Sequence, residues 1–215
     1  MDNLTVIIRN RNEEEYIGFA IQSVLDFYPT AEILIMDNES TDDSIEIVSL
    51  FNKANITIHT ISKLEYSPGL SLNRAANLAS NSNLLVLSAH SQITQTVPVK
   101  ELENMLQQYP AVFGKQTPIY RGKKITKRYI WSHFKNEDAV NMYSGIEDRY
   151  FLHNAFCFYR KDFLLENPFD ETLAGKEDRY WAADIVEKGY EYLYKENLQA
   201  NHYWTKNGAT WKGIG

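Results

Sequence analysis

Cysteine is scarce in this 215-residue chain, which contains only Cys157. A single thiol cannot form an intrachain disulfide, and no spacing of cysteines and histidines resembles a zinc site. Chains without disulfides are typical of reducing compartments. The sequence therefore predicts a cytoplasmic protein.

Long apolar runs are also missing. The longest of them, such as Leu84 to Leu87, are far too short to span a bilayer. The chain opens with Met1-Asp2-Asn3, without the basic start and the apolar run of a signal peptide. We therefore expect neither a membrane span nor a secretory leader.

Basic residues are fewer than acidic ones. The chain has 22 Lys and Arg and 28 Asp and Glu, which give a formal net charge of -6. Nonspecific nucleic-acid binding needs Lys and Arg to neutralise phosphates, so this composition argues against a nucleic-acid partner. Hydrophobic residues make up 44% of the chain and charged residues 23%, which is typical of a folded protein. We expect residues 1–215 to form one domain with a substantial core.

Glycine is absent from the turn after the first predicted strand, Arg9-Asn10-Arg11-Asn12-Glu13. A sugar-nucleotide pyrophosphorylase needs a Gly-rich phosphate loop at this place, and a dinucleotide dehydrogenase needs G-x-G-x-x-G after a strand. The turn therefore argues against both of these enzyme classes.

Strand and helix patterns alternate along the first half of the chain. Short apolar, β-branched runs indicate buried strands, and apolar residues three and four apart indicate helices. We expect Ser40 to cap the second helix and Pro68-Gly69 to form a turn before the third. The predicted elements are strands 4–9, 32–37, 56–61 and 84–87 and helices 16–27, 40–51 and 70–79.

The second half is less regular, and residues 115–153 have no assigned element. The alternation in the first half predicts an α/β fold with a mainly parallel sheet and helices on both faces. Ligands bind beyond the carboxyl ends of such strands, where polar residues follow at 9–12, 37–38 and 88–90. The predicted elements of the second half are helices 99–108 and 178–188 and strands 155–159 and 190–194.

Four polar motifs occur in order along the chain. An Asn-Glu turn follows the first strand, an acidic strand end meets a Ser-Thr-Asp helix start, a Gly-rich turn contains an Arg, and an acidic pair opens a late helix. These motifs are Val6 to Glu14, Ile35 to Asp42, Gly69 to Arg74, and Glu177-Asp178.

In this combination the sequence resembles the inverting glycosyltransferases of family 2, roughly over residues 4 to 204. The resemblance implies a GT-A fold, with a nucleotide-sugar-binding half at about 1–92 and an acceptor-binding, catalytic half at about 93–215. It implies transfer of a sugar from a UDP- or dTDP-sugar to a hydroxyl with inversion, as in polysaccharide or glycan biosynthesis. The implied acceptor is a glycan or a lipid-linked saccharide.

The resemblance also implies roles for residues of the donor site. Asp37, with Asn38 beside it, matches the carboxylate that accepts a hydrogen bond from the pyrimidine base, and Arg74 matches an arginine near the diphosphate. Guanidinium groups suit a diphosphate, which gives Arg9 and Arg11 the same expected role. The alternatives are a turn-forming Asp37 and arginines paired with nearby carboxylates. The full predicted donor set is Arg9, Asn10, Arg11, Glu13, Asp37, Asn38, Arg74, Ser88 and His90.

The acidic pair is the predicted catalytic group. By resemblance, Asp178 is the general base that removes the proton of the acceptor hydroxyl, and Glu177 orients the acceptor. The alternative is that both carboxylates only complement the dipole of the helix that they open. We interpret Arg179 and Asp184 as surface residues of that helix.

One departure from the family concerns metal binding. Its fourth strand normally ends in Asp-x-Asp, which holds a divalent cation, whereas this chain has Ser88-Ala89-His90. Either His90, with His202, holds Mn²⁺ or Mg²⁺ together with the diphosphate, or these groups and the arginines act without metal. Hard cations prefer carboxylate oxygens, which favours the metal-free alternative. The departure also motivates a second hypothesis, a noncatalytic module that binds a nucleotide sugar or glycan, although the retained Asp178 argues against it.

Residues 115–131 form a basic stretch without an acidic residue. In an acidic protein this asymmetry indicates contact with an anionic lipid-linked acceptor or with the inner face of a membrane. The alternative is a solvated loop. The cations are Lys115, Arg121, Lys123, Lys124, Lys127 and Arg128.

Overall fold

The computed structural model describes residues 3–124 and 129–208. Its first half is a parallel sheet in the order β3-β2-β1-β4, formed by β1 (Leu4–Asn10), β2 (Glu32–Asp37), β3 (Ile56–Thr60) and β4 (Asn83–Ser88). The connecting helices are α1 (Ile17–Phe27), α2 (Ser44–Ser49) and α3 (Pro68–Leu78). These elements confirm the predicted strand and helix order of the first half.

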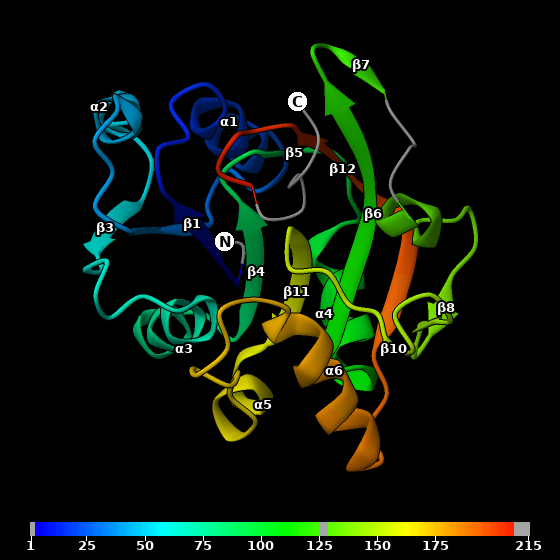
Figure 1. The fold of residues 1–215 in the computed structure, drawn as a ribbon. Coiled ribbons are helices and arrows are strands. Elements are labelled where there is room, and N and C mark those ends of the chain that lie inside the picture. Colours follow the sequence, from blue (N-terminus) through cyan, green and yellow to red (C-terminus); the bar gives the residue numbers. More distant parts are fainter. Residues whose placement is uncertain (1–2, 125–128, 209–215) are drawn as a thin grey trace.

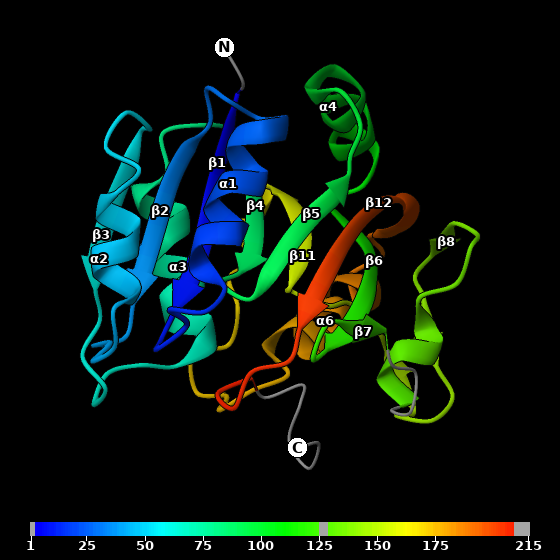
Figure 2. The same ribbon diagram turned by 90° about the horizontal axis from the view of Figure 1, so that it is seen from above.

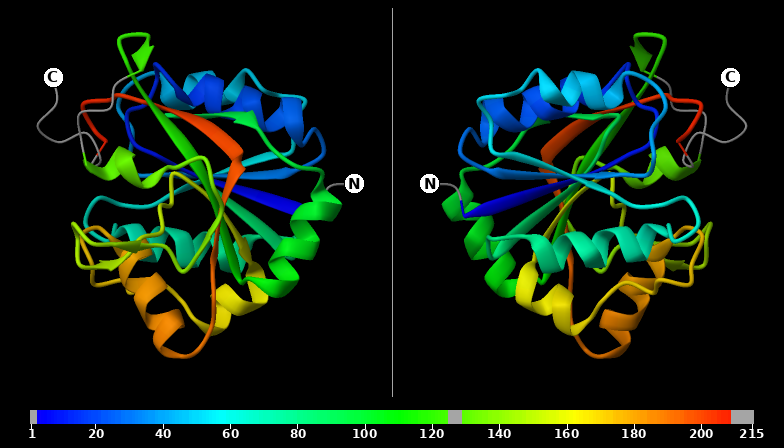
Figure 3. Two further views of the ribbon diagram at one scale, coloured as in Figure 1. Left: turned by 90° about the vertical axis from the view of Figure 1, so that its right-hand side faces the viewer. Right: turned by 90° about the vertical axis from the view of Figure 1, so that its left-hand side faces the viewer.

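Helices cover both faces of this sheet, as predicted. Figure 2 shows α1 and α2 together in front of the parallel strands, and Figure 3 shows α3 on the opposite face. Side chains of α1 and α2 belong to one buried cluster, and those of α3 belong to a second. The two-sided cover explains why β1 and β2 are buried along nearly their whole length.

The sheet continues without a break into the second half (Figure 1). From β4 the order runs through β11 (Phe156–Arg160), β6 (Ala111–Tyr120), β12 (Leu193–Tyr203) and β5 (Ser91–Gln95). Strand β11 is antiparallel to both β4 and β6, so the whole sheet is mixed rather than parallel. The helices of this half are α4 (Val99–Gln108), α5 (Lys161–Glu166) and α6 (Glu177–Glu187).

Short elements lie between β6 and β11, in the stretch for which the sequence predicted nothing. Strand β6 forms a hairpin with β7 (Lys123–Lys124). A 3₁₀ helix, η1 (Tyr129–His133), follows. A separate hairpin joins β9 to β10. The remaining short strands are β8 (Ala139–Val140), β9 (Tyr143–Ser144) and β10 (Arg149–Tyr150).

Two local predictions are wrong. Ser40 does not cap α2, which begins at Ser44; its backbone N–H and hydroxyl instead donate to the Asp37 carboxylate. Pro68 and Gly69 are not a turn but the first residues of α3, where Ser67 is the N-cap and accepts from the Leu70 N–H. Proline suits the first helical position because the amide hydrogen that it lacks has no intrahelical partner there.

The prediction for the last strand begins too early in the chain and is too short. The strand was predicted at 190–194, whereas β12 runs from Leu193 to Tyr203 and changes register between Lys195 and Gln199. Its final residues pair with β5 as well as with β6. This pairing places His202 inside the sheet, next to the end of β4.

No helix among the described ranges 3–124 and 129–208 has the length and apolarity needed to cross a bilayer.

Candidate active site

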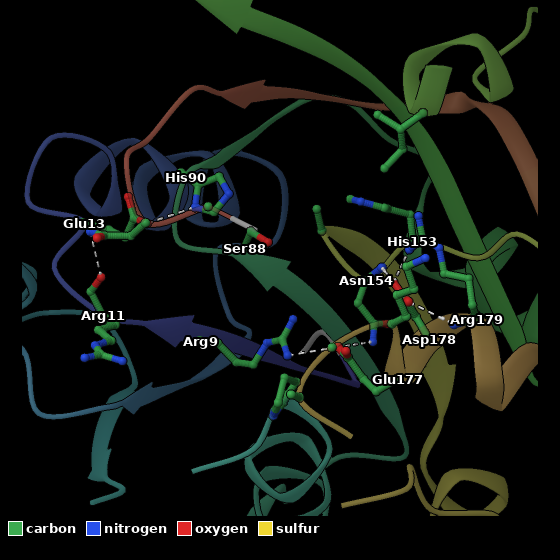
Figure 4. A pocket seen from close by; sticks show the side chains of 18 of the residues that line it. Arg9, Arg11, Glu13, Ser88, His90, His153, Asn154, Glu177, Asp178 and Arg179 are labelled. Carbon is green, nitrogen blue, oxygen red and sulfur yellow. Dashed lines mark hydrogen bonds and ion pairs between the residues drawn. The ribbon is translucent and has the colours of Figure 1, made fainter. Parts of the chain in front are cut away.

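A cavity of about 520 Å³ opens at the carboxyl ends of β1 and β4 and reaches the first turn of α6 (Figure 4). This is the edge at which the sequence predicted a ligand site. Eight predicted site residues line it: Arg9, Asn10, Arg11, Glu13, Ser88, His90, Glu177 and Asp178.

Asp37 and Asn38 lie behind this lining, at the end of β2. Asp37 is 4% exposed, and its carboxylate accepts hydrogen bonds from the side-chain amide of Asn10 (2.9 Å) and from Ser40. The amide of Asn38 donates to the Ile61 carbonyl oxygen. Asp37 therefore orients Asn10, which does line the cavity.

Arg74, predicted to bind the diphosphate, lies outside the lining of the cavity. Its side chain is 46% exposed on α3 and lies 3.4 Å from Glu65. A contact with the diphosphate would require the guanidinium to leave Glu65.

The two carboxylates of α6 are buried and held by different donors. Glu177 Oε1 accepts from Arg9 at 3.0 Å and from the Asn154 side-chain amide at 3.3 Å. Asp178 Oδ2 accepts from the Asn154 backbone N–H at 3.0 Å, and its Oδ1 accepts from the Arg179 N–H at 2.9 Å. Both groups are thus oriented by the protein before any ligand arrives.

Arg9 forms an ion pair with Glu177. Burial acts to lower the pKa of Arg9, but the Glu177 carboxylate, together with Tyr66 and Asp178, outweighs it, and the pKa lies above its ordinary value. Arg9 joins the end of β1 to the start of α6, which links the two halves of the chain across the cavity. The predicted direct contact of Arg9 with a diphosphate therefore competes with this ion pair.

The interpretation of Arg179 as a surface residue is wrong. Arg179 is 6% exposed and lines the cavity, where it donates to Asp178 Oδ2 at 2.8 Å. Its guanidinium also lies 4.5 Å from the centre of the Phe151 ring. Asp184, in contrast, does lie at the surface, paired with Lys188. A helical wheel of the sequence could have shown this difference, because residues five apart in a helix point to different faces.

A line of polar side chains runs from the cavity into the sheet. Glu13 Oε1 lies 3.3 Å from His90 Nδ1, and His90 Nε2 lies 3.0 Å from His202 Nε2. His202 Nδ1 is 2.9 Å from Gln116 Oε1, while the Gln116 amide faces the His153 carbonyl oxygen.

This geometry assigns the protons along the line. Because Gln116 presents its oxygen, His202 Nδ1 carries a hydrogen, and His202 Nε2 accepts from His90 Nε2–H. Burial, reinforced by His90 and His153, holds the pKa of His202 well below its ordinary value, which agrees with a neutral ring. Both ring nitrogens of His90 are thus engaged at the cavity wall, Nε2 with His202 and Nδ1 with Glu13.

The residues here do not fit a resident divalent metal. The described ranges contain no group of three or more His, Cys, Asp or Glu side chains placed to hold one. His90 and His202 supply two nitrogens, already engaged with each other, whereas Mg²⁺ requires oxygen ligands. We therefore derive no chemical step through a metal.

Several lining residues were missed by the sequence analysis. They come from the loop before α3, from residues 129–154, and from the segments just before α6 and after β12, where no periodic pattern marks them. Asn154 carried a weak signal, because it is a polar residue directly before a predicted strand. The missed lining residues include Tyr66, Tyr129, Glu147, Asn154, Lys176 and Asn207.

The sequence model described as "Glycosyl transferase family 2" matches residues 5–166 of this chain. The chain belongs to glycosyl transferase family 2. This assignment confirms the resemblance based on the four motifs.

Two curated relatives show similarity over most of this chain. The O-antigen chain rhamnosyltransferase WbaN of Salmonella anatum is 25% identical over 182 residues, which are 80% of this chain and 56% of WbaN. The O-antigen chain rhamnosyltransferase RfbN of Salmonella typhimurium is 22% identical over 183 residues, 81% of this chain and 57% of RfbN. The chain thus spans little more than half the length of these relatives.

Solved structures confirm the GT-A fold. S. aureus TarS 1-349 in complex with UDP-GlcNAc has a TM-score of 0.72 at 20% identity, over 99% of this chain and 61% of that one. GalNAc-T7 with UDP, GalNAc and Mn²⁺ has a TM-score of 0.71 at 16% identity, over 95% of this chain and 44% of that one.

Proposed function

We propose that this family 2 domain transfers a sugar from a UDP- or dTDP-sugar to an acceptor hydroxyl with inversion. The single observation that carries the proposal is the cavity itself. It joins the carboxyl ends of β1 and β4, where the resemblance puts the donor, to a buried carboxylate pair at the start of α6. In this proposal residues 1–92 hold the donor and residues 93–215 hold the acceptor and the base.

Asp178 is the proposed general base. It takes the proton of the acceptor hydroxyl while the hydroxyl oxygen forms a bond to the anomeric carbon. The bond from that carbon to the diphosphate oxygen breaks on the opposite face, and the electron pair leaves with the diphosphate. Direct displacement of this kind inverts the anomeric carbon, and a buried, oriented carboxylate suits it.

The leaving diphosphate is the second charge that the site must stabilise. We propose that Arg11 donates hydrogen bonds to it without a resident metal, and that the Nδ1–H of His90 does so once the diphosphate takes the place of the Glu13 carboxylate. His90 is oriented for this by Glu13 and His202. Arg11 lines the cavity, and no carboxylate within residues 3–124 and 129–208 forms an ion pair with it, in contrast to Arg9.

Base recognition is proposed at the ends of β1 and β2. The buried side-chain oxygens of Asn10 and Asn38 accept no hydrogen bond from the described residues. Buried polar atoms are nearly always paired, and the N3–H of uracil or thymine is a donor of the missing kind.

Replacing Asp37 with alanine is expected to weaken UDP and dTDP binding by about tenfold, the loss typical of hydrogen bonding to a charged group. The change removes the carboxylate that orients Asn10 and Ser40. Isothermal titration calorimetry measures the affinity, and Asp184→Ala, a surface carboxylate, is the control. Unchanged affinity in a folded Asp37→Ala variant would remove Asp37 from the donor site.

A noncatalytic module that binds a nucleotide sugar or glycan is the second candidate, and Ser88 and His90 in place of Asp-x-Asp favour it. Such a module would bind UDP or dTDP without turning over donor. Donor consumption measured with a panel of UDP- and dTDP-sugars separates the two candidates.

An anionic membrane surface is the proposed partner of the β6–β7 hairpin, which projects beyond the rest of the sheet (Figures 1 and 3). A two-residue turn with positive φ at Arg121 and Gly122 presents three exposed cations, Arg121, Lys123 and Lys124. Lys115 is instead bonded to Asn136. Lys127 and Arg128 of the predicted basic stretch lie outside the described residues.

Replacing Arg121, Lys123 and Lys124 together with alanine is expected to reduce partitioning onto phosphatidylglycerol vesicles by about 100-fold. Each cation near such a surface contributes about 1 kcal/mol. Vesicle sedimentation measures the effect, with Lys53, Lys63 and Lys188 replaced together as the control. Equal partitioning of the hairpin variant and the wild type would favour the solvated-loop interpretation.

A further inference from the structure

Asn154 is the residue that contacts both carboxylates of the acidic pair. It lies two residues before β11, is 2% exposed, and lines the cavity. None of the four sequence motifs includes it. Its contacts are different for the two carboxylates, and this difference can be tested.

The backbone of Asn154 forms a hydrogen bond with Asp178, and its side chain forms one with Glu177. The N–H donates to Asp178 Oδ2 at 3.0 Å, and Nδ2 donates to Glu177 Oε1 at 3.3 Å. An ionised carboxylate only accepts, so the amide must turn its nitrogen toward Glu177 and its oxygen away. A side-chain substitution at Asn154 therefore removes the contact to Glu177 but keeps the one to Asp178.

Tyr159 fixes that orientation from below. Its hydroxyl donates to Asn154 Oδ1 at 2.6 Å, and the ring is fully buried on β11. Burial, reinforced by Cys157, raises the pKa of Tyr159 well above its ordinary value, so the hydroxyl keeps its hydrogen. The chain of contacts from the core to the cavity is thus Tyr159, Asn154, Glu177.

Arg9 completes the arrangement from the other half of the molecule. It donates to the same oxygen, Glu177 Oε1, at 3.0 Å. Both donors to Glu177 therefore meet on one carboxylate oxygen, and together they fix the rotation of the group.

We propose that Asn154, held by Tyr159, is a positioning residue that orients Glu177 for the acceptor and ties it to the base. The proposal rests on the proposed function for its catalytic consequence. The contact chain itself does not depend on any substrate.

Tyr159→Phe and Asn154→Ala are expected to lower turnover of a UDP- or dTDP-sugar by about 10- to 100-fold, while UDP affinity by calorimetry stays within about twofold. The matched control is Tyr194→Phe, which removes another buried hydroxyl, one that donates to the Lys135 carbonyl oxygen at 2.7 Å. The control should lower the melting temperature without changing turnover.

A double-mutant cycle tests the contact chain without substrate. Tyr159→Phe and Glu177→Gln should shift the melting temperature non-additively when combined, because Asn154 couples them, whereas Tyr194→Phe and Glu177→Gln should add. Additive shifts for Tyr159 and Glu177 would overturn the proposal, and so would a folded Tyr159→Phe variant with wild-type turnover. An inactive wild type with a coupled cycle would instead refute the proposed function and leave the positioning of Glu177 supported.

Discussion

Replacing Asp178 with asparagine is expected to reduce sugar transfer by about 10²–10⁴-fold, the usual contribution of a general base. The asparagine keeps the shape of the side chain and removes its basicity. Donor affinity should stay near that of the wild type, because Asp178 lies at the start of α6, on the side of the cavity where the acceptor is proposed to bind. Single-turnover kinetics with saturating donor separate the chemical step from binding.

The control for Asp178→Asn is Asp184→Asn on the same helix. Asp184 is exposed and paired with Lys188, so its replacement should change neither turnover nor affinity. Asp178 also accepts from Arg179, and a melting curve of each variant detects any general loss of structure. An Asp178→Asn enzyme with wild-type turnover would refute the assignment of the base.

Transfer is expected to survive EDTA, and His90→Ala is expected to lower turnover by about 10²-fold in its presence. The second figure is the typical cost of removing one preorganised donor from a developing negative charge. His90 is held from behind by His202 and flanked by Glu13, so it keeps its orientation without a cation. Turnover with EDTA, with added Mn²⁺ and with neither gives the comparison.

His59→Ala is a suitable control, because His59 lies on β3, the edge strand at the far side of β2 from the cavity. His90→Asp restores half of the usual Asp-x-Asp motif and is expected to introduce Mn²⁺ dependence. Loss of transfer in EDTA with recovery in Mn²⁺ would reject the metal-free account and make His90 the leading protein ligand.

The order of strands and helices in the first half could be predicted, because its signals are local. Strands β1, β2 and β4 are buried on both faces and appear as apolar runs, while α1 and α3 show helical spacing. Parallel strands end at one edge, so the position of Arg9 to Glu13 at the cavity followed from order alone.

The second half depends on pairing between distant segments, which a local pattern does not record. Strand β6 contains Gly114, Lys115 and Pro118, so its sequence does not look like that of a central strand. Gly114 is needed because a Cβ there would lie 2.5 Å from the Phe156 ring and 2.6 Å from the Leu198 carbonyl oxygen. The prediction for Ser40 failed for a local reason, because the nearby Asp37 carboxylate accepts from the hydroxyl that would have capped the helix.

Residue type alone also does not show which carboxylate each arginine near the site pairs with. Arg9 and Arg74 were both expected at the diphosphate, but one is paired with Glu177 and the other with Glu65. Arg179, expected at the surface, is the buried partner of the proposed base. Which carboxylate pairs with each arginine is decided by tertiary packing, and sequence spacing does not contain that information.

The configuration of the product at the anomeric carbon tests the central claim most directly. The protein is incubated with α-linked UDP- or dTDP-sugars and an acceptor glycan, and the coupling constant of the anomeric proton is followed by NMR. Displacement assisted by Asp178 in a single step predicts a β-linked product. An α-linked product would contradict the single-displacement mechanism, and consumption of no donor in the panel would contradict the proposed activity.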